Sequence, residues 1–225
     1  MVTIVVMATI RIVGYGGSMA EVMGLRQRNR LAAMRIVQDT AVALFERNGY
    51  DATTIETIAE SSGVSTATIY RHFGNKETIV LWDERETVID GELERRLGRQ
   101  PPLEAFRDAA IAAFDQRDDL DLLRRRLKLV YDHPAILGVA AQIEARNRSE
   151  LAAAFAATRG RRRASINDEV TAAVALTALD VAFTRWQRNN STRRLARTIT
   201  DAFAAAADSS TSASDAANQA VRAHS

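Results

Sequence analysis

Residues 53–76 decide the fold of this chain, and they read TTIETIAESSGVSTATIYRHFGNK. Their apolar side chains recur at helical spacing in two short runs, and Gly63 separates the runs. Glycine is common just past a helix end because it adopts a positive φ angle without a steric penalty. The stretch therefore predicts two short helices joined by a tight turn.

The first of these helices has a helix-start pattern at Thr53 and Glu56. In such a capping box each side chain accepts a hydrogen bond from the backbone amide of the other residue. Ile55 and Ile58 then face inward, and the helix is expected to end near Ser61.

The second helix is predicted from Thr66 to Phe73, with Ser65 as its N-cap and Gly74 as its stop. Ile69 and Phe73 face inward, one turn apart. The side chains expected on the outside are those of Thr66, Ala67, Thr68, Tyr70, Arg71 and His72. Small polar groups at an exposed helix start can reach base edges in the major groove of DNA, so the pair predicts a helix-turn-helix.

The longer pattern around this pair resembles the TetR family of transcriptional regulators. The resemblance covers about residues 26–85 and is carried by Leu44-Phe45, Gly49-Tyr50, Thr53-Thr54, Ile58-Ala59, Gly63-Val64-Ser65, Ile69-Tyr70, His72-Phe73 and Lys76-Glu77. It implies an all-α fold in which a three-helix DNA-binding domain precedes a helical domain for ligand binding and dimerisation.

The resemblance also implies roles for individual residues. It places Thr66, Ala67 and Tyr70 at base edges or the groove wall, and it places Thr54, Arg71, His72 and Lys76 at the phosphate backbone. Ser65 and Thr68 complete the expected DNA-binding set. Arg71 stands where family members often carry an aromatic residue, so either a phosphate or a guanine remains open as its partner.

Simpler roles remain open for three of these residues. Lys76 stands in the first turn of the helix that Asn75 caps, where its ammonium is unfavourable beside the positive end of the helix dipole. A phosphate partner would explain this position, but a solvated lysine is the alternative. His72 could be an ordinary surface histidine, and Tyr70 could serve packing.

Composition excludes several classes of function. The 225 residues include no cysteine and three histidines, which argues against thiol catalysis and cysteine-ligated zinc and fits a reducing cytoplasm. We therefore expect no catalytic residue, no metal site, no cofactor and no membrane association. The formal net charge of +2 permits DNA binding without requiring it.

The two ends of the chain differ from its middle. Residues 1–22 pair an apolar run with a glycine-rich segment, so they predict a disordered extension, or a translation start at Met23 instead of Met1. The expected domains are then 23–75 for DNA binding and 76–207 for effector binding and dimerisation. Residues 208–225 are small and polar, which predicts a disordered tail.

The rest of the chain has the periodicity of helices, and no strand pattern competes with it. A first helix is expected through about Asn48, with one inward stripe formed by Ile36, Thr40, Ala41, Leu44 and Phe45. A single long helix is expected from Lys76 to about Leu97. Later helices are predicted at 103–114, 120–131, 134–158, 168–189 and 192–207.

The last two helices carry more small and apolar residues than one buried stripe requires. They are Val170, Ala173, Val174, Leu176, Thr177, Leu179, Val181 and Ala182, then Leu195, Ile199, Ala202, Phe203 and Ala206. The resemblance implies that these helices pair with those of a second subunit in a four-helix bundle. Such a homodimer would present two reading helices to a pseudo-palindromic operator in double-stranded DNA, although a monomer core is the alternative.

The middle helices are expected to enclose a small-molecule effector. Candidate lining residues are Trp82, Phe106, Phe114, Leu127, Tyr131, Ile143, Phe155, Phe183 and Trp186, each of which could be plain core. The segment 76–83 looks like that of actinobacterial TetR-type regulators, some of which respond to acyl-CoA thioesters, which suggests an apolar or acyl-CoA-like effector. Arg124–Arg126 and Arg161–Arg163 could attract its phosphates or could be solvated.

The sequence therefore predicts a ligand-responsive regulator, a repressor that its effector releases from DNA, and not an enzyme. The alternative is a helical small-molecule-binding or scaffold protein without sequence-specific DNA binding.

Overall fold

The computed structural model describes residues 25–114, 120–188 and 195–208. Within these ranges the regular structure is α-helical, with one isolated bridge between Leu97 and Gln100 and no β-strand. The fold is therefore all-α, as the sequence predicts.

The helices follow one another with short connections. Their bounds are α1 Leu25–Asn48, α2 Ile55–Ser62, α3 Thr66–Phe73, α4 Lys76–Leu81, α5 Glu86–Arg96, α6 Pro102–Phe114, α7 Leu120–Asp132, α8 Pro134–Ala157 and α9 Ile166–Arg188. Residues 195–208 are also helical.

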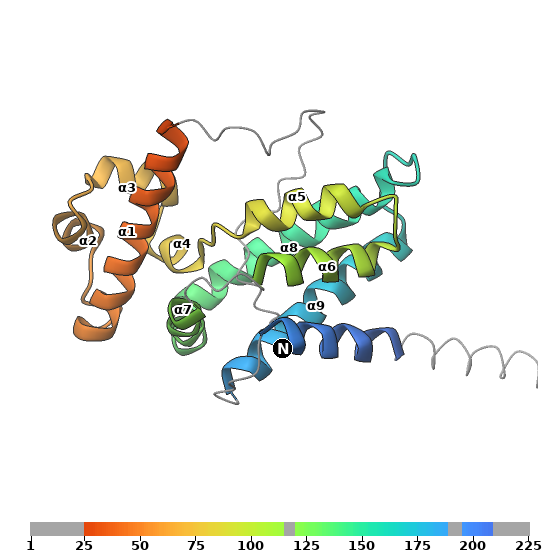
Figure 1. Cartoon of the computed structure of the whole chain (residues 1–225). Coiled ribbons are helices and arrows are strands. Elements are labelled where there is room, and N and C mark those ends of the chain that lie inside the picture. The colour runs from red at the N-terminus through yellow and green to blue at the C-terminus, as the bar shows by residue number, and fades with distance from the viewer. Residues whose placement is uncertain (1–24, 115–119, 189–194, 209–225) are drawn as a thin grey trace, which may run out of the picture.

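The molecule has two parts, which Figure 1 shows at opposite ends. We call α1 to α3 the head, and we call α5 to α9 together with residues 195–208 the body. The short helix α4 lies between them. In the sequence, α4 is therefore the segment that connects the head to the body.

Two clusters of buried apolar side chains form the core. The first joins α5 to α9 and residues 195–208, and it includes Phe106, Phe155 and Phe183. The second fills the head around Phe45, Ile58 and Ile69 and continues through α4 to α7 and α8. The head is thus packed onto the body through α4 and is not an isolated unit.

The single helix predicted from Lys76 to Leu97 is wrong, because the chain breaks between Leu81 and Glu86. Trp82 leaves the helix with φ −59° and ψ 133°. The next residue, Asp83, is a buried carboxylate that bonds two arginines, one of them from α7. Residues 82–85 contain neither glycine nor proline, so the break coincides with these bonds of Asp83 and not with a helix-breaking residue.

The inward stripe predicted for α1 is correct at Ala41, Leu44 and Phe45, which are buried, and wrong at Ile36, which is 51% exposed. Met34 and Val37 are buried in the same part of the helix. Gln38 also faces inward, at 3% exposure, because its amide donates hydrogen bonds to α4. The buried side of α1 therefore includes a polar residue that the predicted stripe omitted.

Several predictions concern residues outside the described ranges. They are the extension at 1–22, the start at Met23 and nearly all of the tail at 208–225. Among the residues that the structure describes, no helix is both long and apolar enough to cross a membrane.

Candidate DNA-binding surface

The turn between α2 and α3 has the geometry that the sequence predicts. Gly63 has φ 69° and follows α2 directly. Ser65 caps α3, because its hydroxyl oxygen accepts from the Thr68 amide at 3.3 Å and its hydroxyl donates to Thr68 Oγ1 at 2.9 Å. These local bonds fix the direction in which α3 leaves the turn.

The start of α2 differs from the predicted capping box. Thr54, not Thr53, is the N-cap, and its hydroxyl oxygen accepts from the Thr57 amide at 3.2 Å. Thr53 is 1% exposed, and its hydroxyl donates to the Gly49 carbonyl at 2.8 Å. Two adjacent threonines carried the same sequence signal, and the buried one instead bonds to the Gly49 carbonyl just after α1.

One face of α3 is directed away from the rest of the head. Ala67, Tyr70 and Arg71 are exposed, and Thr66 is partly exposed beside them. Tyr70 exposes 49% of its surface, while Ile69 and Phe73 on the opposite side are buried. These four outer residues therefore form one continuous surface, which we call the reading face. Its N-terminal part carries the small side chains of Thr66 and Ala67, and its C-terminal part carries Tyr70 and Arg71.

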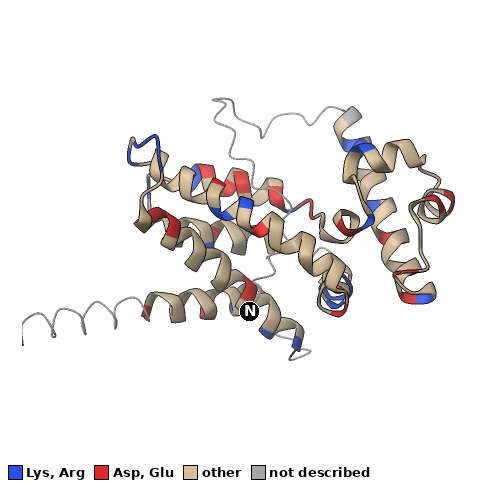
Figure 2. Cartoon of the chain, turned by 180° about the vertical axis from the view of Figure 1, so that it is seen from behind, with Lys and Arg blue, Asp and Glu red and all other residues tan. Residues whose placement is uncertain are grey.

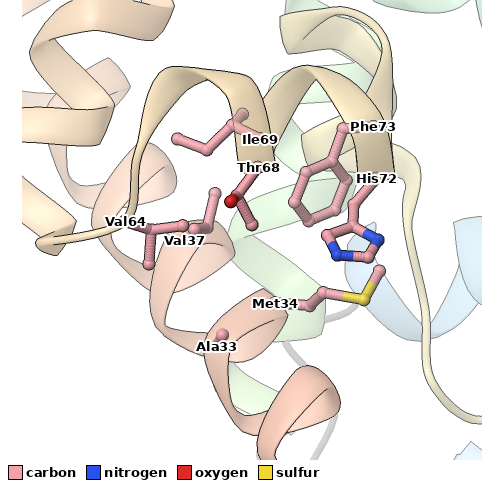
Figure 3. A pocket seen from close by; sticks show the side chains of 8 residues that line it. All are labelled: Ala33, Met34, Val37, Val64, Thr68, Ile69, His72 and Phe73. Carbon is pink, nitrogen blue, oxygen red and sulfur yellow. The ribbon is translucent and has the colours of Figure 1, made fainter. Parts of the chain in front are cut away.

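Thr68 and His72 were expected outside, but they lie half-buried on the flank that faces α1. Both line a small pocket with Ala33, Met34, Val37, Val64, Ile69 and Phe73 (Figure 3). Burial, and then the charges of Arg71 and Arg30, lower the pKa of His72. A neutral His72 retains one N–H donor, so a phosphate contact for it stays a prediction.

Lys76 ties the start of α4 to the turn that precedes α2. Its ammonium donates to the Tyr50 carbonyl at 2.9 Å and to the Thr53 carbonyl at 3.3 Å, and it lies 4.1 Å from the centroid of the Tyr50 ring. The phosphate contact expected of Lys76 remains untested. Lys76 also has a structural role, which explains a lysine in this first turn without DNA.

Tyr50 is a central residue of this region whose contacts sequence reasoning missed. Its hydroxyl donates to Glu77 Oε1 at 2.5 Å, and its ring packs on Phe45 and on His133, which directly precedes α8. Burial and the Glu77 carboxylate raise its pKa. The Gly49-Tyr50 pair was visible in the sequence, but Glu77 and His133, two of the partners of Tyr50, are 27 and more residues away.

The expected effector-lining residues divide into three groups. Six are buried in the body core, and they are Phe106, Phe114, Leu127, Phe155, Phe183 and Trp186. Trp82 and Ile143 instead pack against the cluster that includes the head. Tyr131 is 36% exposed, and its hydroxyl lies 2.7 Å from Thr184 Oγ1.

The arginines that could attract an effector's phosphates have protein partners. The guanidinium of Arg124 lies 4.0 Å from the Trp186 ring centroid, Arg125 pairs with Glu46, and Arg126 pairs with Asp83. In the loop between α8 and α9, at the end of the body away from the head (Figure 2), Arg159 and Arg161 both pair with Asp168. The structure thus provides protein partners for four of the six candidate arginines, namely Arg124, Arg125, Arg126 and Arg161.

Comparison with known proteins agrees with the two-part architecture. A sequence model described as "Bacterial regulatory proteins, tetR family" matches residues 38–81, and one described as "MftR C-terminal domain" matches residues 100–210. The two matches fall on the head with α4 and on the body.

Two relatives show how similarity is distributed. MftR of Mycobacterium tuberculosis, a transcriptional regulator assigned to mycofactocin biosynthesis, is 27% identical over 189 residues, which cover 80% of this chain and 90% of MftR. The regulator TcmR of Streptomyces glaucescens is 34% identical over 102 residues, which cover 44% of this chain and 45% of TcmR.

Solved structures share the fold at low identity. SmeT in complex with triclosan has a TM-score of 0.54 and 18% identity, covering 79% of this chain and 91% of SmeT. FadR of Bacillus subtilis in complex with stearoyl-CoA has a TM-score of 0.52 and 18% identity, covering 76% of this chain and 96% of FadR.

Proposed function

Because the chain belongs to the TetR family of transcriptional regulators, we propose that it is a ligand-responsive repressor. As a homodimer it binds a pseudo-palindromic operator, and a small apolar or acyl-CoA-like effector releases it. The observation that carries the proposal is the reading face of α3, which rigid caps hold away from the head core.

The reading face suits direct contact with base edges. Thr66 and Ala67 are small, so backbone and base can approach closely at the start of α3. Tyr70 supplies an aromatic surface and a hydroxyl, and Arg71 supplies a cation at the far end of the same face. Arg30 lies near enough to His72 to affect its pKa, which brings a second cation to the same edge.

The outer side of α9 supports the homodimer. Ile166, Val170 and Val181 expose 81%, 55% and 36% of their surface. With the partly buried Val174 and the exposed Thr177, they recur every three to four residues on one side, while Leu176, Leu179 and Phe183 fill the core on the other. A second copy of α9 covers such a stripe in a helical bundle.

The body core supports an apolar effector. Phe114 and Phe183 meet edge to face with centroids 5.1 Å apart, and Phe106 and Phe203 lie 6.2 Å apart. Small alanines surround these rings, including Ala109, Ala113 and Ala175. Aromatic rings among alanines can separate to admit a hydrocarbon chain with little loss of buried polar bonding.

The test measures binding of the purified chain to the DNA that adjoins its own gene, against scrambled DNA of equal length at physiological salt. We expect saturable, sequence-dependent binding by a dimer, and release when stearoyl-CoA or a shorter acyl-CoA is added. Equal, salt-sensitive affinity for both DNAs would instead support the helical scaffold alternative.

The dimer is tested separately by Val170→Glu combined with Val181→Glu. Two charges per chain on the outer side of α9 should convert the protein to monomers in sedimentation while leaving its helical content unchanged. A variant that stays dimeric would place the interface elsewhere.

A further inference from the structure

The C-terminal end of α4 is held in an unusual way. A helix leaves its last carbonyl groups without donors from its own backbone. In α4 the Trp82 amide donates to the Thr78 carbonyl at 2.9 Å, and the four carbonyls that follow, from Ile79 to Trp82, accept from side chains of two other helices. The end of α4 is thus bonded by tertiary contacts and not by a local cap.

The head contributes Gln38 of α1. Its amide nitrogen donates to the Ile79 carbonyl at 2.7 Å and to the Trp82 carbonyl at 2.6 Å, which uses both of its N–H groups. Gln38 is 3% exposed, so water does not replace these bonds at low cost.

The body contributes Arg126 of α7. Nε donates to the Val80 carbonyl at 2.7 Å, Nη2 donates to the Leu81 carbonyl at 3.2 Å, and Nη1 donates to Asp83 Oδ2 at 3.0 Å. Arg126 is 1% exposed. Its planar fork therefore spans the end of α4 and the residue that breaks the helix.

The two side chains bond to α4 from different parts of the molecule, Gln38 from the head and Arg126 from the body. Gln38 takes the first and last of the four carbonyls, and Arg126 takes the two between them. If α7 moves relative to α1, either one pair of bonds breaks or α4 moves with its partner. A buried, directional contact of this kind has discrete arrangements, as a regulatory coupling requires.

We propose that Gln38 and Arg126 are positioning residues that clamp the end of α4 and thereby set the orientation of the reading face relative to the body. This inference rests on the proposed function, because it assigns the route by which an effector in the body changes DNA binding. Neither residue lies on the reading face.

A surface contact provides a matched control. Arg125, the neighbour of Arg126 on α7, also reaches α1, where it pairs with Glu46 at 2.6 Å. Its side chain is 34% exposed and that of Glu46 is 41% exposed. Exposed ion pairs contribute little to stability or positioning, so Arg125→Met should change little.

The first readout is the distance between head and body. The chain has no cysteine, so Glu60→Cys on α2 and Glu94→Cys on α5, both at exposed positions, accept two spin labels. Labelled chain is mixed with excess unlabelled chain, so the distance is measured within one chain whether or not it dimerises. We expect Arg126→Met and Gln38→Leu to make the distance distribution about twofold wider, and Arg125→Met to leave it unchanged.

The second readout is operator affinity. If Gln38 and Arg126 only stabilised the fold, substituting them would not change operator affinity in a variant that is still a folded dimer. We expect Arg126→Met to weaken operator binding about tenfold, within the range known for remote coupling residues. Because both residues act through α4, Gln38→Leu should add little to Arg126→Met in the double variant.

Folding is controlled by helical content and by a second substitution. Asp83 keeps three bonds from Arg85 in Arg126→Met, from the Arg85 amide at 3.0 Å, Nε at 2.8 Å and Nη2 at 3.0 Å, so its carboxylate is not left unpaired. Arg126→Lys retains the charge but cannot span both carbonyls and the carboxylate, and we expect an intermediate width.

The outcomes separate the two proposals. If the parent chain does not prefer operator DNA, the proposed function fails, and the distance readout still decides on the clamp. If Gln38→Leu, Arg126→Lys and Arg126→Met all keep the parent's distance distribution, the clamp inference is overturned.

Discussion

The head and the body are stabilised in different ways. The helices α2 and α3 of the head have eight residues each, and each has a side-chain N-cap and a glycine with positive φ at its end. The body helices α8 and α9 have 24 and 23 residues, and the body core consists mainly of aromatic rings, leucines and alanines. The shape of the head is therefore encoded in local sequence, whereas the shape of the body depends on packing between distant residues.

The largest effect is expected from a substitution of Tyr70, which lies on the reading face of the head. In the proposed homodimer, Tyr70→Ala should weaken operator binding by about 2–6 kcal/mol, because each of the two subunits would lose a contact of about 1–3 kcal/mol. Tyr70 is 49% exposed, so the thermal midpoint should hardly change. Titration of operator DNA with the variant measures the change in affinity. Unchanged affinity would mean that the DNA-contacting surface lies elsewhere on the protein.

The next effect concerns the backbone at the turn of the head. Gly63→Ala should destabilise the protein by about 1–2 kcal/mol, because Gly63 has φ 69° and a side chain is strained in that region. The matched body control is Gly91→Ala within α5, where there is open space and no positive φ. That variant should be more stable by about 0.5–1 kcal/mol, because alanine favours helix.

Denaturant unfolding of both glycine variants gives the comparison directly. Equal destabilisation by the two substitutions would contradict the claim that the head depends on a local backbone requirement that the body lacks.

A smaller effect is expected from the cap of α3. Ser65→Ala removes the acceptor for the Thr68 amide and should cost about 1 kcal/mol. Ser149 lies within α8, where its hydroxyl donates to the Ala145 carbonyl, so Ser149→Ala should change stability by less than about 0.5 kcal/mol. Thermal unfolding distinguishes the pair, and a cap substitution without cost would mean that tertiary packing alone orients α3.

The smallest effect is the pH dependence of His72. Burial lowers its pKa in the folded state, so the neutral ring stabilises the fold at pH above the unfolded pKa of about 6.5. That stabilisation is lost as the pH falls from about 6.5 through the lower folded pKa. Thermal midpoints at several pH values should therefore fall more on acidification in the parent than in His72→Gln, and parallel profiles would exclude a role for His72.

Much of the head could be predicted from sequence, because its determinants are close together in the chain. The Ser65 cap, the Gly63 turn and the inward Ile69 and Phe73 all lie within residues 63–73. Even here the choice between Thr53 and Thr54 as the cap was decided by the Gly49 carbonyl at the end of α1. Local patterns predict helices well, but not which of two equivalent side chains finds a buried partner.

The contacts around α4 could not be predicted, because they join residues about 40 positions apart. Asp83 and Arg126 meet across 43 residues, and Gln38 and Ile79 across 41. A glutamine among inward positions of α1 was the one available signal, since a buried amide requires partners. The same limit applies to the effector, because apolar rings at helical spacing specify a core and not the ligand that enters it.

The most direct test of the account is a hydroxyl-radical footprint of the 225-residue chain on the DNA that adjoins its own gene. We expect two protected patches related by a two-fold axis, with centres about one helical turn of DNA, or a small multiple of it, apart. A single protected patch, or uniform protection along the DNA, would contradict the claim that the body pairs two locally specified heads for sequence-specific binding.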